Sequence, residues 1–138
     1  MKKAGVVCSL VVTLFVLGCG QPTTLVSMSV TPTSAYQTGY GVSQFQFTAY
    51  GNFIHPTESR DITKEVTWTS AIPAIATVDS NGLLTTAPNA CGETIITATA
   101  GKNLIGRNSA DSQAEMNATA TFTIYVKSVD TCPQPPSS

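Results

Sequence analysis

From Leu25 onward the chain runs in short stretches of alternating apolar and polar residues, rich in Val, Ile, Thr, Phe and Tyr. Gly, Pro, Asn and Asp separate these stretches, and none keeps apolar residues at the spacing of an amphipathic helix. Because alternation places successive side chains on opposite faces of a strand, the pattern predicts an all-β chain. Seven such runs suit a β-sandwich. They are Leu25–Thr31, Ser43–Tyr50, Glu65–Ser70, Ala74–Val78, Leu83–Ala87, Glu93–Ala100 and Thr119–Lys127.

The same alternation separates side chains that enter the core from those that face solvent. Phe47 stands with Phe45 and Ala49 on the inward side of its run, and Phe122 is inward in the last run. Trp68 alternates with threonines, so we expect it to be a buried aromatic in the middle of the sandwich. A lone Trp can instead stack on sugars at a surface.

The N-terminal residues 1–18 have the features of a secretory signal peptide. Lys2 and Lys3 precede an apolar stretch that is too short to span a bilayer as a stable helix. Residues 16–19, Val-Leu-Gly-Cys, then resemble the lipobox of bacterial lipoproteins. The resemblance implies that Cys19 carries fatty acids such as palmitate and becomes the first residue of the mature chain. Since Gly20 is not the Asp that marks inner-membrane retention, it also implies the outer membrane if the cell has one.

Two cysteines remain once the signal peptide is removed and Cys19 carries lipid. Cys91 lies just before the run Glu93–Ala100, and Cys132 follows the run Thr119–Lys127. If these two runs pair antiparallel, both cysteines lie outside the same end, and an even pair in an exported chain predicts a disulfide. Two cysteines and a single histidine are too few for a metal site, and we expect no cofactor.

Four motifs follow one another in a fixed order: Asp-Ile-Thr at 61–63, VTWTS at 66–70, IATVDSNGLLT at 75–85 and GETIITA at 92–98. Together they resemble the bacterial Ig-like domain, group 2. The resemblance extends from residue 25 to about residue 127 and implies an Ig-like, seven-stranded antiparallel β-sandwich with Greek-key connections. The chain departs from the family pattern in the long connection 101–118 and in the Cys91 and Cys132 pair.

The sequence therefore predicts four segments. Residues 1–18 are the signal peptide and residues 19–24 a lipid-anchored linker. Residues 25–128 are the Ig-like domain, and residues 129–138 are a tail rich in Pro and Ser that cannot form a ladder. The linker is short, so we expect the start of the first strand to lie close to the membrane.

No arrangement of residues in the sequence suggests catalysis. His55 is the single histidine, and no Gly-x-Ser-x-Gly elbow is present to hold a nucleophile. The acidic residues Glu58, Asp61 and Glu65 alternate with basic ones, which indicates a solvated loop of mixed charge rather than a pair of catalytic carboxylates. We expect a protein that is not an enzyme.

Charged residues make up 11% of the chain, less than half of the roughly 25% that is usual, and no basic cluster exists outside the signal peptide. Nucleic-acid binding is therefore excluded. Tyr36, Tyr40, Tyr50 and Phe53 lie near expected turns and could form a binding surface, or could cap the ends of the sandwich.

We thus expect an exported cell-envelope module for surface binding or adhesion. Its partners would be the membrane, through the lipid on Cys19, and an envelope protein or a surface glycan. The alternative is a structural accessory subunit or spacer of a larger envelope assembly. In either case the connections 51–63 and 101–118 are expected at the membrane-proximal pole, with Cys91 and Cys132 at the distal pole.

Overall fold

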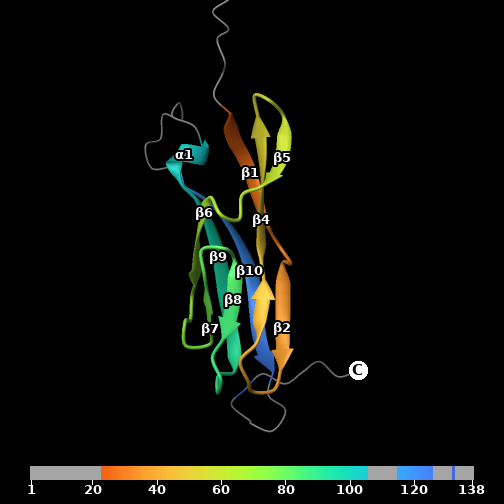
Figure 1. Ribbon diagram of the computed structural model, residues 1–138, viewed down its shortest axis with the longest axis vertical. Coiled ribbons are helices and arrows are strands. Elements are labelled where there is room, and N and C mark those ends of the chain that lie inside the picture. Colours follow the sequence, from red (N-terminus) through yellow and green to blue (C-terminus); the bar gives the residue numbers. More distant parts are fainter. Residues whose placement is uncertain (1–22, 106–114, 126–131, 133–138) are drawn as a thin grey trace, which may run out of the picture.

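The computed structural model describes residues 23–105, 115–125 and 132. The signal peptide, Cys19 and most of the C-terminal tail lie outside the described residues. Strands dominate the described part, as Figure 1 shows. The elements are β1 (Thr24–Thr31), β2 (Ser34–Thr38), β3 (Gln44–Gln46), β4 (Thr48–Ile54), β5 (Glu58–Asp61), β6 (Val66–Ser70), β7 (Ala76–Val78), β8 (Leu83–Thr86), β9 (Gly92–Ala100), α1 (Lys102–Ile105) and β10 (Met116–Tyr125).

These strands form the two layers of a sandwich. One layer is a four-stranded sheet in the order β2-β10-β9-β6. The other contains the sheets β1-β4-β5 and β3-β8-β7, which continue into each other because a single residue, Phe47, separates β3 from β4. Aromatic rings of Phe45 and Phe122, one from each layer, meet with their centroids 4.9 Å apart. The predicted all-β, Ig-like sandwich is confirmed.

The first two strands follow each other closely but belong to different layers. β1 pairs antiparallel with β4, and after residues 32–33 the chain continues as β2, which pairs in parallel with β10. Pro32 lies at the crossing point, where its missing N–H interrupts the ladder. The N-terminal segment therefore supplies an edge strand to both layers.

Two strands in the structure have no counterpart in the sequence prediction. β5 lies within the expected loop 51–63, because β4 continues to Ile54 and pairs with β5 in a hairpin. Its residues Glu-Ser-Arg-Asp contain no apolar side chain, so hydrophobic alternation could not identify it. β2 was missed because Gln37, a polar residue, occupies an inward position and its amide donates to the carbonyl oxygens of Gly39 and Gly41 at 3.1 and 3.0 Å.

The expected long connection 101–118 contains the short helix α1, and β10 begins at Met116. The residues between them, 106–114, lie outside the described residues. The β1 start, the β4–β5 hairpin and α1 lie at one end of the sandwich, which we call the β1 pole (Figure 1). The ends of β2 and β10 lie at the opposite end.

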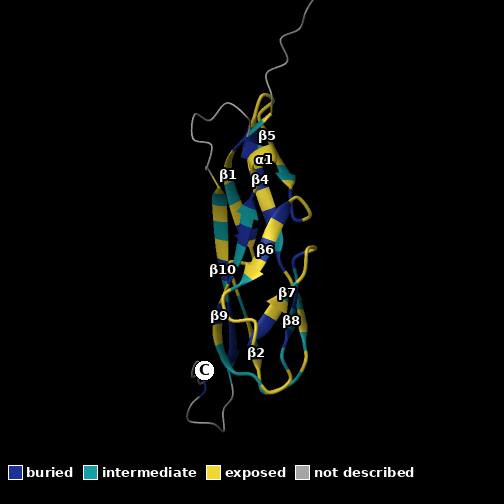
Figure 2. Ribbon diagram, turned by 90° about the vertical axis from the view of Figure 1, so that its left-hand side faces the viewer, coloured by how far each residue is buried: buried dark blue, intermediate teal, exposed yellow. Residues whose placement is uncertain are grey.

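Burial follows the alternation along each strand (Figure 2). Phe47 and Phe122 are fully buried, and Trp68 is buried with its indole N–H donating to the carbonyl oxygen of Thr63 at 2.8 Å. The neighbouring threonines of β6, Thr67 and Thr69, face solvent. All three residues expected in the core thus lie there.

The break between β3 and β4 coincides with a change of pairing partner. The Phe47 amide donates to the carbonyl oxygen of Gly82 at 2.9 Å, and the Ala49 amide donates to the hydroxyl oxygen of Thr63 at 3.0 Å. Both amides are thereby satisfied, although Phe47 lies between β3 and β4 and the register of β4 with β5 begins only at Tyr50. The turn before β8 and the loop before β6 therefore supply the hydrogen-bond acceptors at the junction of β3 and β4.

Gly82 ends the tight turn at residues 79–82, as the sequence predicted. Its φ is +75°, a left-handed conformation that favours glycine. The Asp79 carboxylate accepts hydrogen bonds from the amides of Leu83 at 2.9 Å and Asn81 at 2.8 Å, and the Leu83 bond chiefly lowers the pKa of Asp79. A Cβ on Gly82 would collide with the Phe47 carbonyl oxygen.

We predict that Gly82→Ala destabilises the protein by about 3 kcal/mol or more, measured by urea denaturation. The left-handed φ alone costs an alanine roughly 1–2 kcal/mol, and the collision with the Phe47 backbone adds to it because a backbone atom cannot move away as a flexible side chain can.

Gly39→Ala is the matched control. Gly39 has a similar φ of +84°, but a Cβ there would meet nothing within 4 Å. This variant should lose only the roughly 1–2 kcal/mol of backbone strain. Equal losses in the two variants would show that the contact between Gly82 and Phe47 is unimportant.

Candidate functional site

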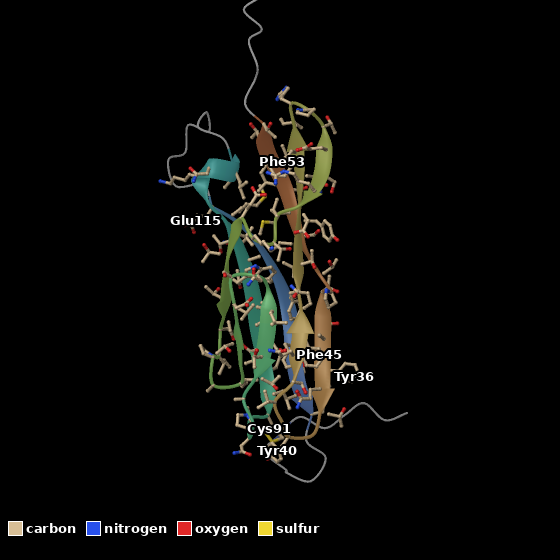
Figure 3. All side chains as sticks on the ribbon, viewed as in Figure 1. Tyr36, Tyr40, Phe45, Phe53, Cys91 and Glu115 are labelled. Atoms are coloured by element: carbon tan, nitrogen blue, oxygen red, sulfur yellow. A yellow bond between two sulfur atoms is a disulfide. The ribbon has the colours of Figure 1, made fainter. Side chains whose placement is uncertain are left out.

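The four aromatic residues predicted as a binding surface do not form one patch. Tyr36, Tyr40 and Tyr50 are exposed, with 66%, 50% and 42% of their surface accessible. Phe53 is only 2% exposed, so it cannot contribute to a binding surface and instead fits the alternative of a side chain that caps the end of the sandwich. Figure 3 places Phe53 near the β1 pole and Tyr36 and Tyr40 toward the opposite end.

Phe53 is buried because β4 is longer than the sequence suggested. Alternation along β4 turns Ala49, Gly51 and Phe53 inward and leaves Tyr50 outside. Phe53 pairs with Leu25 of β1, and the guanidinium of Arg60 lies over its ring at 4.4 Å from the centroid. The side chain therefore seals the core at the β1 pole.

The remaining exposed tyrosines lie on both layers. Tyr36 is on β2, and its ring meets the edge of Tyr125 on β10, with centroids 5.9 Å apart. Tyr40 follows in the bend after β2, where the Gly39 amide donates to the Tyr125 carbonyl oxygen at 2.6 Å. Tyr50 belongs to β4, in the other layer. Tyr36 and Tyr125 thus form an aromatic pair, Tyr40 follows β2 in the adjoining bend, and Tyr50 lies in the other layer.

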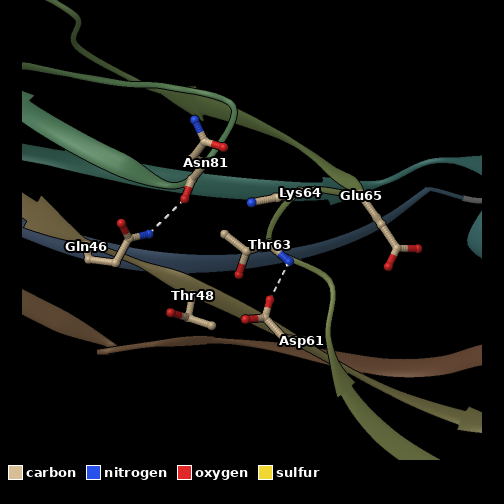
Figure 4. A pocket seen from close by; sticks show the side chains of 7 residues that line it. All are labelled: Gln46, Thr48, Asp61, Thr63, Lys64, Glu65 and Asn81. Carbon is tan, nitrogen blue, oxygen red and sulfur yellow. Dashed lines mark hydrogen bonds between the residues drawn. The ribbon is translucent and has the colours of Figure 1, made fainter.

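A second surface feature is a polar hollow beside the junction of β3 and β4 (Figure 4). It has a volume of about 630 Å³ and opens to solvent. The Gln46 amide nitrogen donates to the carbonyl oxygen of Asn81 at 2.7 Å, and Asp61 accepts from the Thr63 amide at 2.8 Å. The seven lining residues are Gln46, Thr48, Asp61, Thr63, Lys64, Glu65 and Asn81.

The polar groups of this hollow stabilise the loop that they belong to. Hydrogen bonds from Thr63, first its hydroxyl and then its amide, hold the pKa of Asp61 below its ordinary value. Arg60 binds Glu65 through both guanidinium nitrogens and also lies 3.5 Å from a Glu58 oxygen. The solvated loop of mixed charge that the sequence indicated is therefore present as an ion-pair network.

Nothing in this loop has the geometry of a catalytic pair. His55 lies at the exposed tip of the β4–β5 hairpin, and its carbonyl oxygen accepts a hydrogen bond from the Thr23 hydroxyl at 3.2 Å.

Among residues 23–105, 115–125 and 132, no three His, Cys, Asp or Glu side chains are grouped so that they could hold a metal ion. In the same residues no helix is long and apolar enough to cross a membrane.

A family model described as "Bacterial Ig-like domain (group 2)" matches residues 25–105, which is more than half of the chain. The chain belongs to the bacterial Ig-like domain family, group 2. No curated protein matches it. Family members occur in bacterial surface proteins and are typically non-catalytic. This Ig-like domain extends beyond the matched segment, because β10 pairs with β9 along nine register positions from Met116 to Ile124.

The predicted disulfide of this Ig-like domain is confirmed. Cys91 and Cys132 are bonded, with their Cα atoms 5.5 Å apart. Cys91 lies immediately before β9, and Figure 3 places it with Tyr40 at the end opposite the β1 pole, which we call the disulfide pole. The bond ties the segment after β10 to the start of its neighbour β9.

We predict that Cys91→Ala destabilises the Ig-like domain by about 4 kcal/mol, as measured by urea denaturation. The disulfide joins residues separated by 41 positions. Closing a loop of that length lowers the conformational entropy of the unfolded chain, which raises its free energy by about 4 kcal/mol.

Reduction provides the control, because dithiothreitol should destabilise the wild-type domain by a similar amount and leave Cys91→Ala unchanged. If reduction leaves the stability of the wild-type domain unchanged, the bond does not stabilise the fold.

Proposed function

We propose that this protein is a lipid-anchored, non-catalytic Ig-like module that binds a partner at the bacterial cell envelope. The proposal depends on what lies at each of the two poles of the sandwich. The start of β1 lies at one pole, and Tyr36, Tyr40 and the disulfide lie toward the other (Figures 1 and 3). An anchor before β1 would leave the disulfide pole facing away from the membrane.

The proposed anchor is Cys19, within the lipobox-like sequence at 16–19. Each buried methylene of an acyl chain contributes about 0.8 kcal/mol, so two or more chains give stable membrane binding where one does not. The short segment between Cys19 and β1 then keeps the β1 pole beside the bilayer. If the cell has two membranes, the outer membrane is the proposed location, because Gly20 is not an Asp.

The exposed tyrosines support a binding role. The carboxylates that accept hydrogen bonds from the backbone support a non-catalytic role. Tyr36 and Tyr40 keep half or more of their surface accessible although large aromatic side chains are usually buried on average. The carboxylates of Asp61 and Asp79, in contrast, are held by backbone amides. Carboxylates held in this way stabilise turns.

A role as a spacer in an envelope assembly is the alternative. The elongated sandwich and its ordered hairpin at the β1 pole favour it, since a spacer needs length more than a specific surface (Figure 1). Co-purification with envelope proteins that persists when Tyr36 is replaced would support the spacer role over binding through the tyrosines.

We predict that Cys19 is the N-terminal, acylated residue of the mature protein. Mass spectrometry of the protein extracted from membranes should find fatty acids on the peptide that begins with Cys19. Cys19→Ala should remove the fatty acids and release the protein from the detergent phase. An unmodified N-terminus at another residue would contradict the anchor.

We further predict that the membrane shields Lys102 but not Lys64. Both side chains are exposed, but Lys102 begins α1 at the β1 pole, whereas Lys64 lines the hollow part-way along the molecule. In vesicles carrying the lipidated protein, acetylation of Lys102 should be several-fold slower than in a variant with a longer tether.

The control tether inserts about 20 Gly and Ser residues between Gln21 and Pro22, which lets the domain move roughly 25 Å from the bilayer. Acetylation of Lys64 should be equal in both proteins. Equal acetylation of Lys102 in both would show that the β1 pole does not rest on the membrane.

A further inference from the structure

The outer face of the four-stranded sheet differs in composition from an ordinary protein surface. Its strands alternate, so that side chains opposite the core-facing residues Phe122, Ile124 and Ile96 share this face. Among the described residues, Glu93 is its single charged side chain, and Ile95 is its single aliphatic one. We call it the threonine face; it consists of Ser34, Tyr36, Thr38, Thr67, Thr69, Glu93, Ile95, Thr97, Thr99, Asn117, Thr119, Thr121, Thr123 and Tyr125.

Strand register arranges these hydroxyls in rows across the sheet. One row consists of Thr69, Thr97 and Thr119 on β6, β9 and β10. A parallel row continues with Thr67 and Thr99. Neighbouring strands lie about 4.8 Å apart, and successive outward residues of one strand about 6.7 Å apart, so the hydroxyls form a regular two-dimensional array.

Most of these hydroxyls are available for a ligand. Thr99 donates to Asn117 at 2.6 Å, and Thr123 lies 3.5 Å from a Glu93 oxygen. In the described part of the chain, no other side chain hydrogen-bonds the remaining threonine hydroxyls of the face, which are Thr38, Thr67, Thr69, Thr97, Thr119 and Thr121. Each free hydroxyl can both donate and accept a hydrogen bond.

The tyrosines give the same face an apolar component. Tyr36 pairs in register with Thr123, and its ring meets that of Tyr125 edge to face. Tyr36 is 66% exposed, so its ring presents a flat apolar surface beside the rows of hydroxyls. A sugar ring has the matching composition, because its C–H groups pack on an aromatic ring while its hydroxyls form hydrogen bonds.

We propose that the threonine face binds an uncharged polysaccharide. The inference rests on the proposed binding function and names its ligand class. The near absence of charge matches a neutral polymer, since a charged one would leave its groups without counterions. β10 presents outward side chains over a strand of 10 residues, roughly 30 Å, which can accommodate several sugar units.

Other ligands fit this face less well. Protein interfaces bury an apolar centre, and Ile95 alone is too little aliphatic surface to form one. An anionic polymer or lipid would need basic side chains, and the described residues of the face include none. The observed combination of hydroxyls and exposed aromatic rings therefore favours carbohydrate.

Retention of the full-length, detergent-solubilised protein on insoluble polysaccharides tests the proposal. The probes are the neutral polymers cellulose, chitin and an insoluble α-glucan, with cross-linked polygalacturonate as a charged control. We expect retention on at least one neutral polymer and none on polygalacturonate. That retention should change little between about 50 mM and 500 mM sodium chloride, since no ion pairs are involved.

Two pairs of variants locate the binding surface. Tyr36→Ala should weaken retention about tenfold, whereas Tyr50→Ala, which removes an exposed tyrosine from the other layer, should leave it unchanged. Thr69→Glu should weaken retention by placing a charge in the array, whereas Thr77→Glu, at an exposed position of β7, should not. Thermal unfolding checks that each variant is folded.

Several results would overturn the proposal. These are lack of retention on every neutral polymer, retention that Tyr36→Ala and Thr69→Glu leave intact, and a dimer in size-exclusion chromatography that Tyr36→Ala converts to a monomer. The last result would identify the face as a contact between two copies of the chain. Acylation of Cys19 and protection of Lys102 are measured separately. A failure of polysaccharide binding would therefore leave the proposed membrane anchor unaffected.

Discussion

The fold depends on a small set of buried contacts where one strand passes from one sheet to another. At Phe47 the chain leaves its pairing with β8 and begins its pairing with β1 and β5. The carbonyl of Gly82 and the hydroxyl of Thr63 satisfy the backbone there, and Trp68 fixes Thr63 through its indole N–H. Unsatisfied amides in a core cost about 1–3 kcal/mol each, so the turn, the loop and the tryptophan are needed together.

Much of this architecture follows from hydrophobic alternation. The inward positions of Phe47, Trp68 and Phe122 could be predicted because each stands in a run whose neighbours are polar. The disulfide could be predicted because strand pairing alone brings Cys91 and Cys132 to one end. Both inferences use local pattern or simple topology, and neither requires knowledge of how loops pack.

The errors arose where backbone pairing, rather than side-chain burial, determines structure. β5 is a strand because its backbone continues the β4 ladder, and its polar side chains carry no signal of that pairing. The sequence left open whether Phe53 forms a binding surface or caps the sandwich, because a loop was expected from Gly51; Phe53 in fact lies on the inward side of an extended β4. The rows of threonine hydroxyls could not be predicted, because they depend on strand register.

The parallel pairing of β2 with β10 has a mechanical consequence. The two strands run in the same direction over five register positions from Ser34 to Thr38, with the chain entering β2 from the β1 pole and leaving β10 toward the disulfide pole. A pulling force between a membrane anchor before β1 and a ligand held on the threonine face would act along these strands. Their hydrogen bonds would then bear the load in shear, all at once, whereas a force across the strands would break them one after another.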